Sequence, residues 1–114
     1  MNYNIITTDN FEKEAKRLKK KYISLKKDLQ KLKTYLIHPP HGIPLGNNAY
    51  KIRIAVKSKG KGKRGGLRVI TYLEIDLLIV NLTNIFLLSI YDKSETENIT
   101  KDELKRLINN QKTK

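Results

Sequence analysis

The segment from Tyr50 to Tyr72 holds the residues of this sequence that could act on an anion. It contains eight lysines and arginines and no acidic residue. A protein core does not bury that many unpaired charges, so the segment must form a surface. Clustered cations bind phosphates, and the segment therefore favours a polyanion ligand, RNA in particular.

Alternation within this segment predicts where its cations point. Apolar residues recur at every second position through Ile52, Ile54 and Val56, as in a half-buried strand. This pattern places Lys51, Arg53 and Lys57 together on the exposed face. A second strand begins at Leu67. It directs Arg68, with Ile70 and Tyr72, to the face opposite Leu67 and Val69.

The loop between these strands matches the pattern G-x-G-x-x-G at residues 60–65. That pattern binds dinucleotides only between a strand and a helix, whereas here a strand follows. The loop is also not a P-loop, because no Gly-Lys-Ser/Thr closes it. Two interpretations remain: a solvated loop, or a docking site for phosphates. The second is favoured because residues 29–73 contain ten cations and no acid. The predicted docking cations are Lys57, Lys59, Lys61, Lys63 and Arg64.

Other chemistries find little support. The chain has no cysteine, which excludes disulfides and thiol catalysis. His38 and His41 flank two prolines with no third ligand nearby, so we expect neither a metal nor a cofactor. Tyr91 and Lys93 stand at the end of an apolar run. Tyr91 could stack on a base while Lys93 reaches a phosphate, or the pair could be a core-rim tyrosine beside a surface lysine.

Catalysis by this chain would have to come from cations and perhaps a tyrosine. The sequence has no nucleophile elbow, no HExxH and no clustered carboxylates. One reaction suits such a set, the cleavage of RNA by its own 2′-OH. The protein need only align the nucleophile, move protons and stabilise the phosphorane. A lysine crowded by cations can have a lowered pKa and act as a base, and arginines stabilise the added charge.

The surrounding pattern predicts a small α+β domain of order β-α-α-β-β-β-α, in which a helical hairpin packs on a mainly antiparallel twisted sheet. The hairpin has a strongly basic outer face. Capping residues are expected at Asp9 with Glu12, at Ser24, and at Thr100 with Glu103. The predicted parts are strands at 3–7, 50–57, 67–80 and 85–91, helices starting near 9, 24 and 100, an irregular connection at 42–48, a turn at 82–84 and a frayed tail at 109–114.

The length and charge of the chain limit the classes of protein to which it could belong. A chain of 114 residues is expected to form one domain, residues 1–114. Its net charge of +13 predicts attraction to phosphate backbones. The N-terminus lacks the features of a signal peptide, and the most apolar run is too short and polar to span a bilayer. We expect a soluble cytoplasmic protein without membrane partners.

At these residues the chain resembles the RelE/ParE toxin superfamily, closest to its HigB-like branch. Two stretches carry the resemblance, GIPLGNNAYKIRIAVKSKGKGKRGGLRVITY and IFLLSIYDKSETENITKDELKRLI. It covers nearly the whole chain and implies the RelE-like fold. It also implies the toxin of a type II toxin–antitoxin module, with a cognate antitoxin of helix-turn-helix, HigA-like type. Operator DNA would be bound only through the antitoxin complex.

RelE and HigB members are ribosome-dependent mRNA endonucleases, or mRNA interferases, so the resemblance implies mRNA and the ribosome with its 16S rRNA as partners. The catalytic residues it implies are Lys51, Arg53, Arg68, Tyr91 and Lys93. Many members carry a catalytic Tyr or His in the C-terminal segment, where this chain has Asn98 and Ile99. Two alternatives remain, a ParE-like inhibitor of DNA gyrase and a non-catalytic RNA-binding protein.

Overall fold

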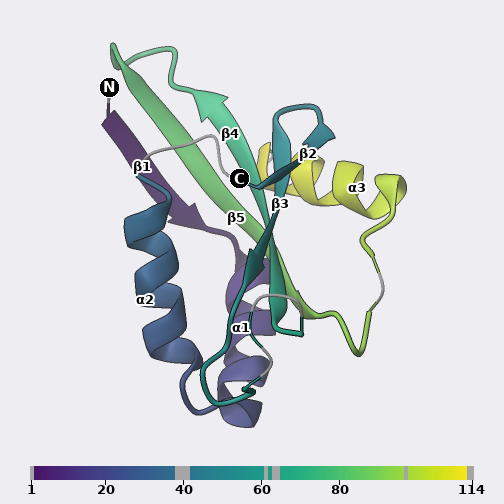
Figure 1. The fold of residues 1–114 in the computed structure, drawn as a ribbon. Helices are drawn as coiled ribbons and strands as arrows, with labels where there is room; N and C mark the ends of the chain where they lie inside the picture. Colours follow the sequence, from purple (N-terminus) through teal and green to yellow (C-terminus); the bar gives the residue numbers. More distant parts are fainter. Residues whose placement is uncertain (1, 38–41, 61, 63–64, 97, 113–114) are drawn as a thin grey trace.

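A five-stranded sheet flanked by three helices makes up the part of the chain that the structure describes (Figure 1). The structure is a computed structural model and describes residues 2–37, 42–60, 62, 65–96 and 98–112. Within these residues no helix has both the length and the apolar character needed to cross a membrane. The elements are β1 (Asn2–Thr7), α1 (Asp9–Lys21), α2 (Leu25–Tyr35), β2 (Ile43–Gly46), β3 (Ala49–Ile54), β4 (Leu67–Ile75), β5 (Leu82–Asp92) and α3 (Lys101–Lys112).

The strands lie in the order β1-β5-β4-β3-β2. β1 runs parallel to β5, and the other neighbouring pairs are antiparallel. The predicted α+β fold, with a helical hairpin on a mainly antiparallel sheet, is therefore confirmed. The structure contains one strand that was not predicted, β2, between α2 and β3.

Each face of the sheet has its own apolar core. On one face, Leu87 and Ile85 of β5 pack with Leu18 of α1 and Leu29 of α2. On the other face, Leu88 of β5 packs with residues of α3. β5 lies between β1 and β4 and is covered on both faces, which explains why its sequence is apolar on both sides.

The connection at residues 42–48, predicted to be irregular, contains β2. This strand pairs with β3 at the edge of the sheet. Pro44 has no backbone N–H to donate, and an edge strand tolerates proline for that reason. The predicted helix end at His38 to His41 lies outside the described residues. The last regular helical residue of α2 is Tyr35.

The turn between β4 and β5 was placed too late in the sequence. β4 ends at Ile75, not near Val80, and residues 82–84 begin β5 rather than forming the turn. The run of apolar residues from Leu77 to Val80 suggested strand. Asp76 instead closes a turn, because its Oδ1 accepts hydrogen bonds from the backbone N–H groups of Leu78 (2.8 Å) and Ile79 (2.9 Å).

Two of the predicted helix caps differ in detail. Thr8, not Asp9, caps α1, because its hydroxyl accepts from the N–H of Phe11 at 3.2 Å. Ser24 occupies the N-cap position of α2 without capping it, and its hydroxyl donates instead to Asp28 Oδ2 at 2.7 Å.

The cap of α3 follows the prediction, since the Thr100 hydroxyl accepts from the N–H of Glu103 at 3.1 Å. The expected frayed tail is wrong for residues 109–112, because α3 continues to Lys112. Apolar side chains at Leu107 and Ile108 pack against the sheet and hold the end of this helix.

A close backbone approach fixes the junction of β3 and β4. A Cβ at Gly66 would lie 1.9 Å from the carbonyl oxygen of Ile54, so no larger residue fits there without moving a strand. The approach holds the end of β3 beside the start of β4. It thereby sets the register in which Ile54 faces Leu67 and Arg53 faces Arg68.

Candidate active site

Three of the predicted catalytic residues form one row across three neighbouring strands. Arg53 of β3 lies opposite Arg68 of β4, and Arg68 lies opposite Tyr91 of β5. Directly opposed residues have Cβ atoms about 5 Å apart. Lys51 stands two residues before Arg53 and so extends the same face. This cationic row, defined as Lys51, Arg53, Arg68 and Tyr91, lies on the α3 side of the sheet.

The two arginines of the row place two positive charges on directly opposed residues. Arg68 is only 3% exposed, and its guanidinium donates to the carbonyl of Leu67 at 3.2 Å. Burial lowers the pKa of Arg68, and so does the charge of Arg53. Arg68 still keeps its proton, since arginine titrates far above neutral pH. Two like charges on opposed residues destabilise a sheet unless an anion offsets them.

Tyr91 contributes a buried hydroxyl. The residue is 6% exposed, and its hydroxyl makes no hydrogen bond of standard geometry to the described residues. Burial raises the pKa of Tyr91, while the backbone of Ile99 and the charge of Arg68 partly oppose that shift. The phenol is therefore protonated at neutral pH.

The segment after β5 crosses the cationic row. Lys51 Nζ donates to Asn98 Oδ1 at 3.3 Å, and Ile99 packs against the apolar cluster that includes Tyr91. Asn98 and Ile99 thus occupy the neighbourhood where the resemblance expected a catalytic Tyr or His. Neither side chain can exchange a proton near neutral pH.

Lys57 and Lys59 have different environments. β3 ends at Ile54, so Lys57 lies beyond the strand in which it was predicted. Its side chain is exposed, and its backbone N–H donates to Asp28 Oδ2 at 3.3 Å. Lys59 was expected to be a docking cation. Its side chain is only 11% exposed, and its Nζ lies 2.7 Å from Asp92 Oδ1. The other three predicted docking cations lie outside the described residues. They are Lys61, Lys63 and Arg64.

Asp92 is the functional neighbour that sequence reasoning missed. Its carboxylate is fully buried and accepts hydrogen bonds from Lys59, from the Tyr22 hydroxyl and from the hydroxyl (2.7 Å) and N–H (3.0 Å) of Ser94. Burial alone would raise the pKa of Asp92, but these hydrogen bonds outweigh it and hold the pKa far below the ordinary range. The signal available in the sequence was an isolated acid at the end of an apolar strand.

Lys93 stands apart from the row. It lies one residue beyond β5, in the turn closed by bonds from the N–H groups of Glu95 and Thr96 to the Asp92 carbonyl. Its side chain is exposed. No hydrogen bond or ion pair joins it to any other described residue. Its predicted role beside Tyr91 therefore has no contact to support it in this structure.

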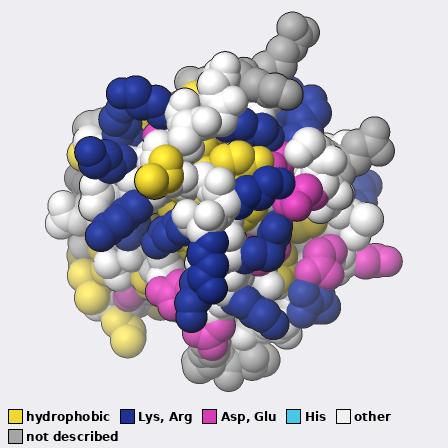
Figure 2. All heavy atoms as spheres, turned by 90° about the horizontal axis from the view of Figure 1, so that it is seen from below, with side chains coloured by type: hydrophobic (Ala, Val, Ile, Leu, Met, Phe, Trp, Pro, Cys, Tyr) yellow, Lys and Arg dark blue, Asp and Glu magenta, His cyan; other side chains and the backbone are white. Residues whose placement is uncertain are grey.

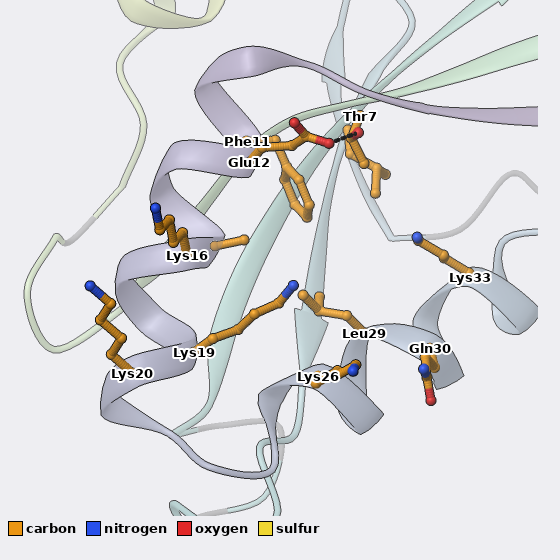
Figure 3. Close-up of a pocket in the computed structure, with 12 residues that line it drawn as sticks. Thr7, Phe11, Glu12, Lys16, Lys19, Lys20, Lys26, Leu29, Gln30 and Lys33 are labelled. Atoms are coloured by element: carbon orange, nitrogen blue, oxygen red, sulfur yellow. Dashed lines mark hydrogen bonds between the residues drawn. The ribbon is translucent and has the colours of Figure 1, made fainter.

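A basic groove of about 570 Å³ separates α1 from α2 (Figure 3). Apolar side chains of Phe11, Ala15 and Leu29 line it. Lys19 reaches across it toward α2, whereas Lys16 and Lys20 point outward. The end of the molecule near the α1–α2 turn carries many Lys and Arg side chains, with fewer Asp and Glu among them (Figure 2). The lysines that line the groove are Lys16, Lys19, Lys20, Lys26 and Lys33.

A second groove, of about 550 Å³, lies between α2 and β3. Arg53, Lys31 and Lys57 line it together with Leu32 and Ile52. Arg53 is exposed and belongs both to the lining of this groove and to the row. Among the described residues, no group of three His, Asp or Glu side chains could hold a metal ion.

The fold and the site define the class of protein. A helical hairpin on a mainly antiparallel sheet is the fold implied above for toxins of toxin–antitoxin systems. The family model of the RelE toxin of the RelE/RelB toxin–antitoxin system matches residues 3–113. The chain belongs to this family. It is therefore the toxin of such a system, with a cognate antitoxin as its partner. The predicted superfamily is confirmed, while the HigB-like branch stays a prediction.

We predict that Asp92→Asn destabilises the protein by about 3 kcal/mol at pH 7, because it leaves the buried charge of Lys59 without its partner. The folded-state pKa of Asp92 is depressed, so its stabilising effect is present above about pH 5 and is lost as the pH falls below about 4. Urea denaturation between pH 7 and pH 3 measures both effects. The variant should lose less stability on acidification than the wild type.

Glu95→Gln is the matched control, since Glu95 pairs with Arg17 and Lys21 but its side chain is 38% exposed. It should cost less than about 1 kcal/mol. Equal losses for the two variants would show that the Asp92 carboxylate has no special role.

Proposed function

We propose that this toxin is a ribosome-dependent mRNA endonuclease that cleaves RNA through the RNA's own 2′-OH. The observation that carries the proposal is the cross-strand row of Arg53, Arg68 and Tyr91. It supplies two cations for the developing charge and one proton donor. Membership of the RelE toxin family supports the same conclusion independently.

The row suits the charge changes of this reaction. The 2′-OH loses its proton to water as its oxygen attacks the adjacent phosphorus, which forms a phosphorane with an additional negative charge. The bond from phosphorus to the 5′-oxygen then breaks, leaving a 2′,3′-cyclic phosphate and a 5′-hydroxyl end. Arg68 would stabilise that charge through paired hydrogen bonds, while Lys51 and Arg53 would hold the phosphates on either side. Because the RNA brings its own nucleophile, alignment and charge stabilisation can supply most of the rate. Lys93 would contact RNA from the turn after β5.

Tyr91 fits the role of general acid. Since burial raises its pKa, its hydroxyl holds a proton at neutral pH and can give it to the leaving 5′-oxygen. Its hydroxyl makes no hydrogen bond of standard geometry to the described residues and interacts only weakly with the backbone of Ile99, so a substrate oxygen can replace that interaction. Asn98 and Ile99 cannot perform this step.

Access to Arg68 and Tyr91 requires a rearrangement. Both residues are buried, while Arg53 is exposed to solvent. The proposal is that RNA first contacts Arg53 and then displaces Asn98 and Ile99 from the row. Breaking the 3.3 Å bond from Lys51 to Asn98 frees the lysine for a phosphate.

The basic groove would dock the toxin on the ribosome. A codon needs only a few phosphate contacts, whereas the net charge of +13 can neutralise many more. We assign the lysines of the α1–α2 groove, with Lys57 and the predicted loop cations Lys61, Lys63 and Arg64, to 16S rRNA. Lys59 is left out because Asp92 holds it. The proposal includes a cytoplasmic location, one domain, and a helix-turn-helix antitoxin of HigA-like type that carries the complex to operator DNA.

We predict that Arg53→Ala lowers ribosome-dependent mRNA cleavage about 10²- to 10³-fold, through loss of one charge-stabilising group. Arg53 is exposed, so the fold should stay intact and the thermal midpoint should change little. Arg68→Ala would be harder to interpret, because removing that buried side chain would also change packing and stability. Mapping of 5′ ends in a translated message gives the readout.

The matched control is Arg106→Ala, on the outer side of α3, where Arg106 pairs with Glu103. It should cleave like the wild type. Wild-type cleavage by Arg53→Ala would remove Arg53 from the site. Growth arrest with intact mRNA and gyrase-dependent DNA breaks would favour the ParE-like alternative.

We predict that Tyr91→Phe lowers cleavage about 10²-fold or more without lowering stability. The substitution removes a hydroxyl that makes no hydrogen bond of standard geometry to the described residues and only a weak interaction with the Ile99 backbone, so the free energy of unfolding should change by less than about 1 kcal/mol. Single-turnover cleavage and thermal unfolding should be measured on the same preparation. A variant that cleaves at the wild-type rate would exclude Tyr91 as the proton donor.

We predict that ribosome binding weakens steeply with salt. Contact with about six single-strand-like phosphates gives a log–log slope near −4. Lys19→Gln/Lys20→Gln should make the slope shallower by about 1.4, whereas Lys101→Gln/Lys105→Gln on α3 should leave it unchanged. Filter binding to small ribosomal subunits at several KCl concentrations tests this. Equal slopes for both double variants would contradict docking through the helical hairpin.

A further inference from the structure

The connection between β4 and β5 exposes an unusual concentration of apolar side chains. Ile75, Leu77, Leu78, Ile79 and Val80 are 74%, 95%, 94%, 56% and 84% exposed. We call residues 75–80 the apolar tip. It lies at the opposite end of the molecule from the α1–α2 turn (Figure 1). Single exposed apolar residues are ordinary, but a contiguous group marks an interaction surface.

The apolar tip is held in one shape. Both backbone bonds accepted by Asp76 Oδ1 fall within it, and Asp76 Oδ2 accepts from the Asn84 amide at 3.3 Å. The Asp76 N–H donates to the Leu82 carbonyl at 2.9 Å, and Asn81 has a φ of 62° that closes the turn. A preformed surface loses little conformational entropy when a partner binds.

The charge around the tip differs from that of the rest of the protein. No Lys or Arg occurs between residues 69 and 92, in a chain that has 24 of them. The acids near the tip are Glu74 and Asp76. The charged side chains of this stretch are all acidic, which favours a partner that carries cations beside its apolar residues over nucleic acid or anionic lipid.

We propose that the apolar tip docks the cognate antitoxin, through an antitoxin segment whose apolar side chains are flanked by Lys or Arg. Family membership supplies the partner. The proposal does not depend on RNA cleavage. The tip lies seven residues along β4 from Arg68, or about 23 Å at about 3.3 Å per residue. An antitoxin held there gains affinity without covering the cationic row, so anchoring and inhibition are separate contacts.

A second copy of the chain suits the tip less well. Fully burying a Leu, Ile or Val hides roughly 60–120 Å², so the five side chains offer roughly 300–600 Å², against about 800 Å² per partner in a stable interface. A symmetric contact would also bring together the Glu74 and Asp76 carboxylates of two chains that each carry a net charge of +13. An antitoxin can add contacts along the neighbouring edge strand β1, which the bond from Asn2 N–H to the Asn81 carbonyl (2.8 Å) holds beside the tip.

The test uses the full-length toxin and the product of the reading frame adjacent to its gene. Calorimetric titration compares wild-type toxin with Leu77→Ser/Leu78→Ser. The expected result is at least tenfold weaker binding by the double variant, because both leucines would be buried in the interface. Ile23→Ser is the matched control, an apolar residue 91% exposed in the α1–α2 turn, and it should bind within twofold of the wild type.

Several outcomes would overturn the proposal. These are unchanged binding by the double variant, no binding of the adjacent-frame product by wild-type toxin, a wild-type homodimer that the double variant abolishes, or tip-dependent binding to phosphatidylcholine vesicles. Measuring cleavage on the same proteins tests the nuclease hypothesis separately from the docking hypothesis. The double variant should cleave mRNA like the wild type. A wild-type protein that does not cleave would contradict the nuclease hypothesis and leave the binding comparison valid.

Discussion

The buried carboxylate of Asp92 is the interaction on which the arrangement of the site depends. It is fully buried in a chain of net charge +13, and it gathers Lys59 from the β3–β4 loop, Tyr22 from the end of α1 and Ser94 from the turn after β5. One anion thus joins three segments that are distant in the sequence. A buried charge is stable only with its partners in place, so these segments adopt their positions together.

This constraint determines how the cationic row is presented. Tyr91 precedes Asp92 on β5, and the Asp92 network fixes the point at which that strand ends. The carboxylate of Asp28 acts in parallel from α2, where it accepts from Ser24 and from the N–H of Lys57. The two acids hold the start of the basic loop against the helical hairpin. They leave Arg53 free at the surface while Arg68 and Tyr91 remain covered.

The sequence predicted the strand faces on which Lys51, Arg53 and Arg68 lie, because its signals were local and periodic. Alternation through Ile52 and Ile54 set the faces of β3, and the position of Arg68 after the glycines set the face of β4. The register that opposes Arg53 to Arg68 was not predictable. It depends on the close approach of Gly66 to the Ile54 carbonyl. A contact between two strands produces no periodic pattern in a single sequence.

Other features escaped prediction for related reasons. The apolar residues from Leu77 to Val80 have the composition of a strand, yet Asp76 turns the chain through side-chain-to-backbone bonds that outweigh β propensity. In sequence, Lys59 resembles the other lysines of its loop, yet its side chain is mostly buried against Asp92. The two residues are 33 positions apart, so only the folded structure shows that they meet. Under the two proposals above, the basic end of the molecule would bind RNA and the apolar tip would bind a protein partner.

The most direct test of the central claim, that the row cleaves RNA by 2′-OH attack, is the chemistry of the cut ends. Wild-type toxin, ribosomes and an mRNA carrying a single 2′-deoxynucleotide on the 5′ side of the mapped scissile phosphate should be compared with the unmodified message. The account predicts 5′-hydroxyl ends and 2′,3′-cyclic phosphates on the unmodified mRNA, and no cut at the deoxy position. Ends with 5′-phosphates, or equal cleavage of the deoxy-substituted message, would contradict it.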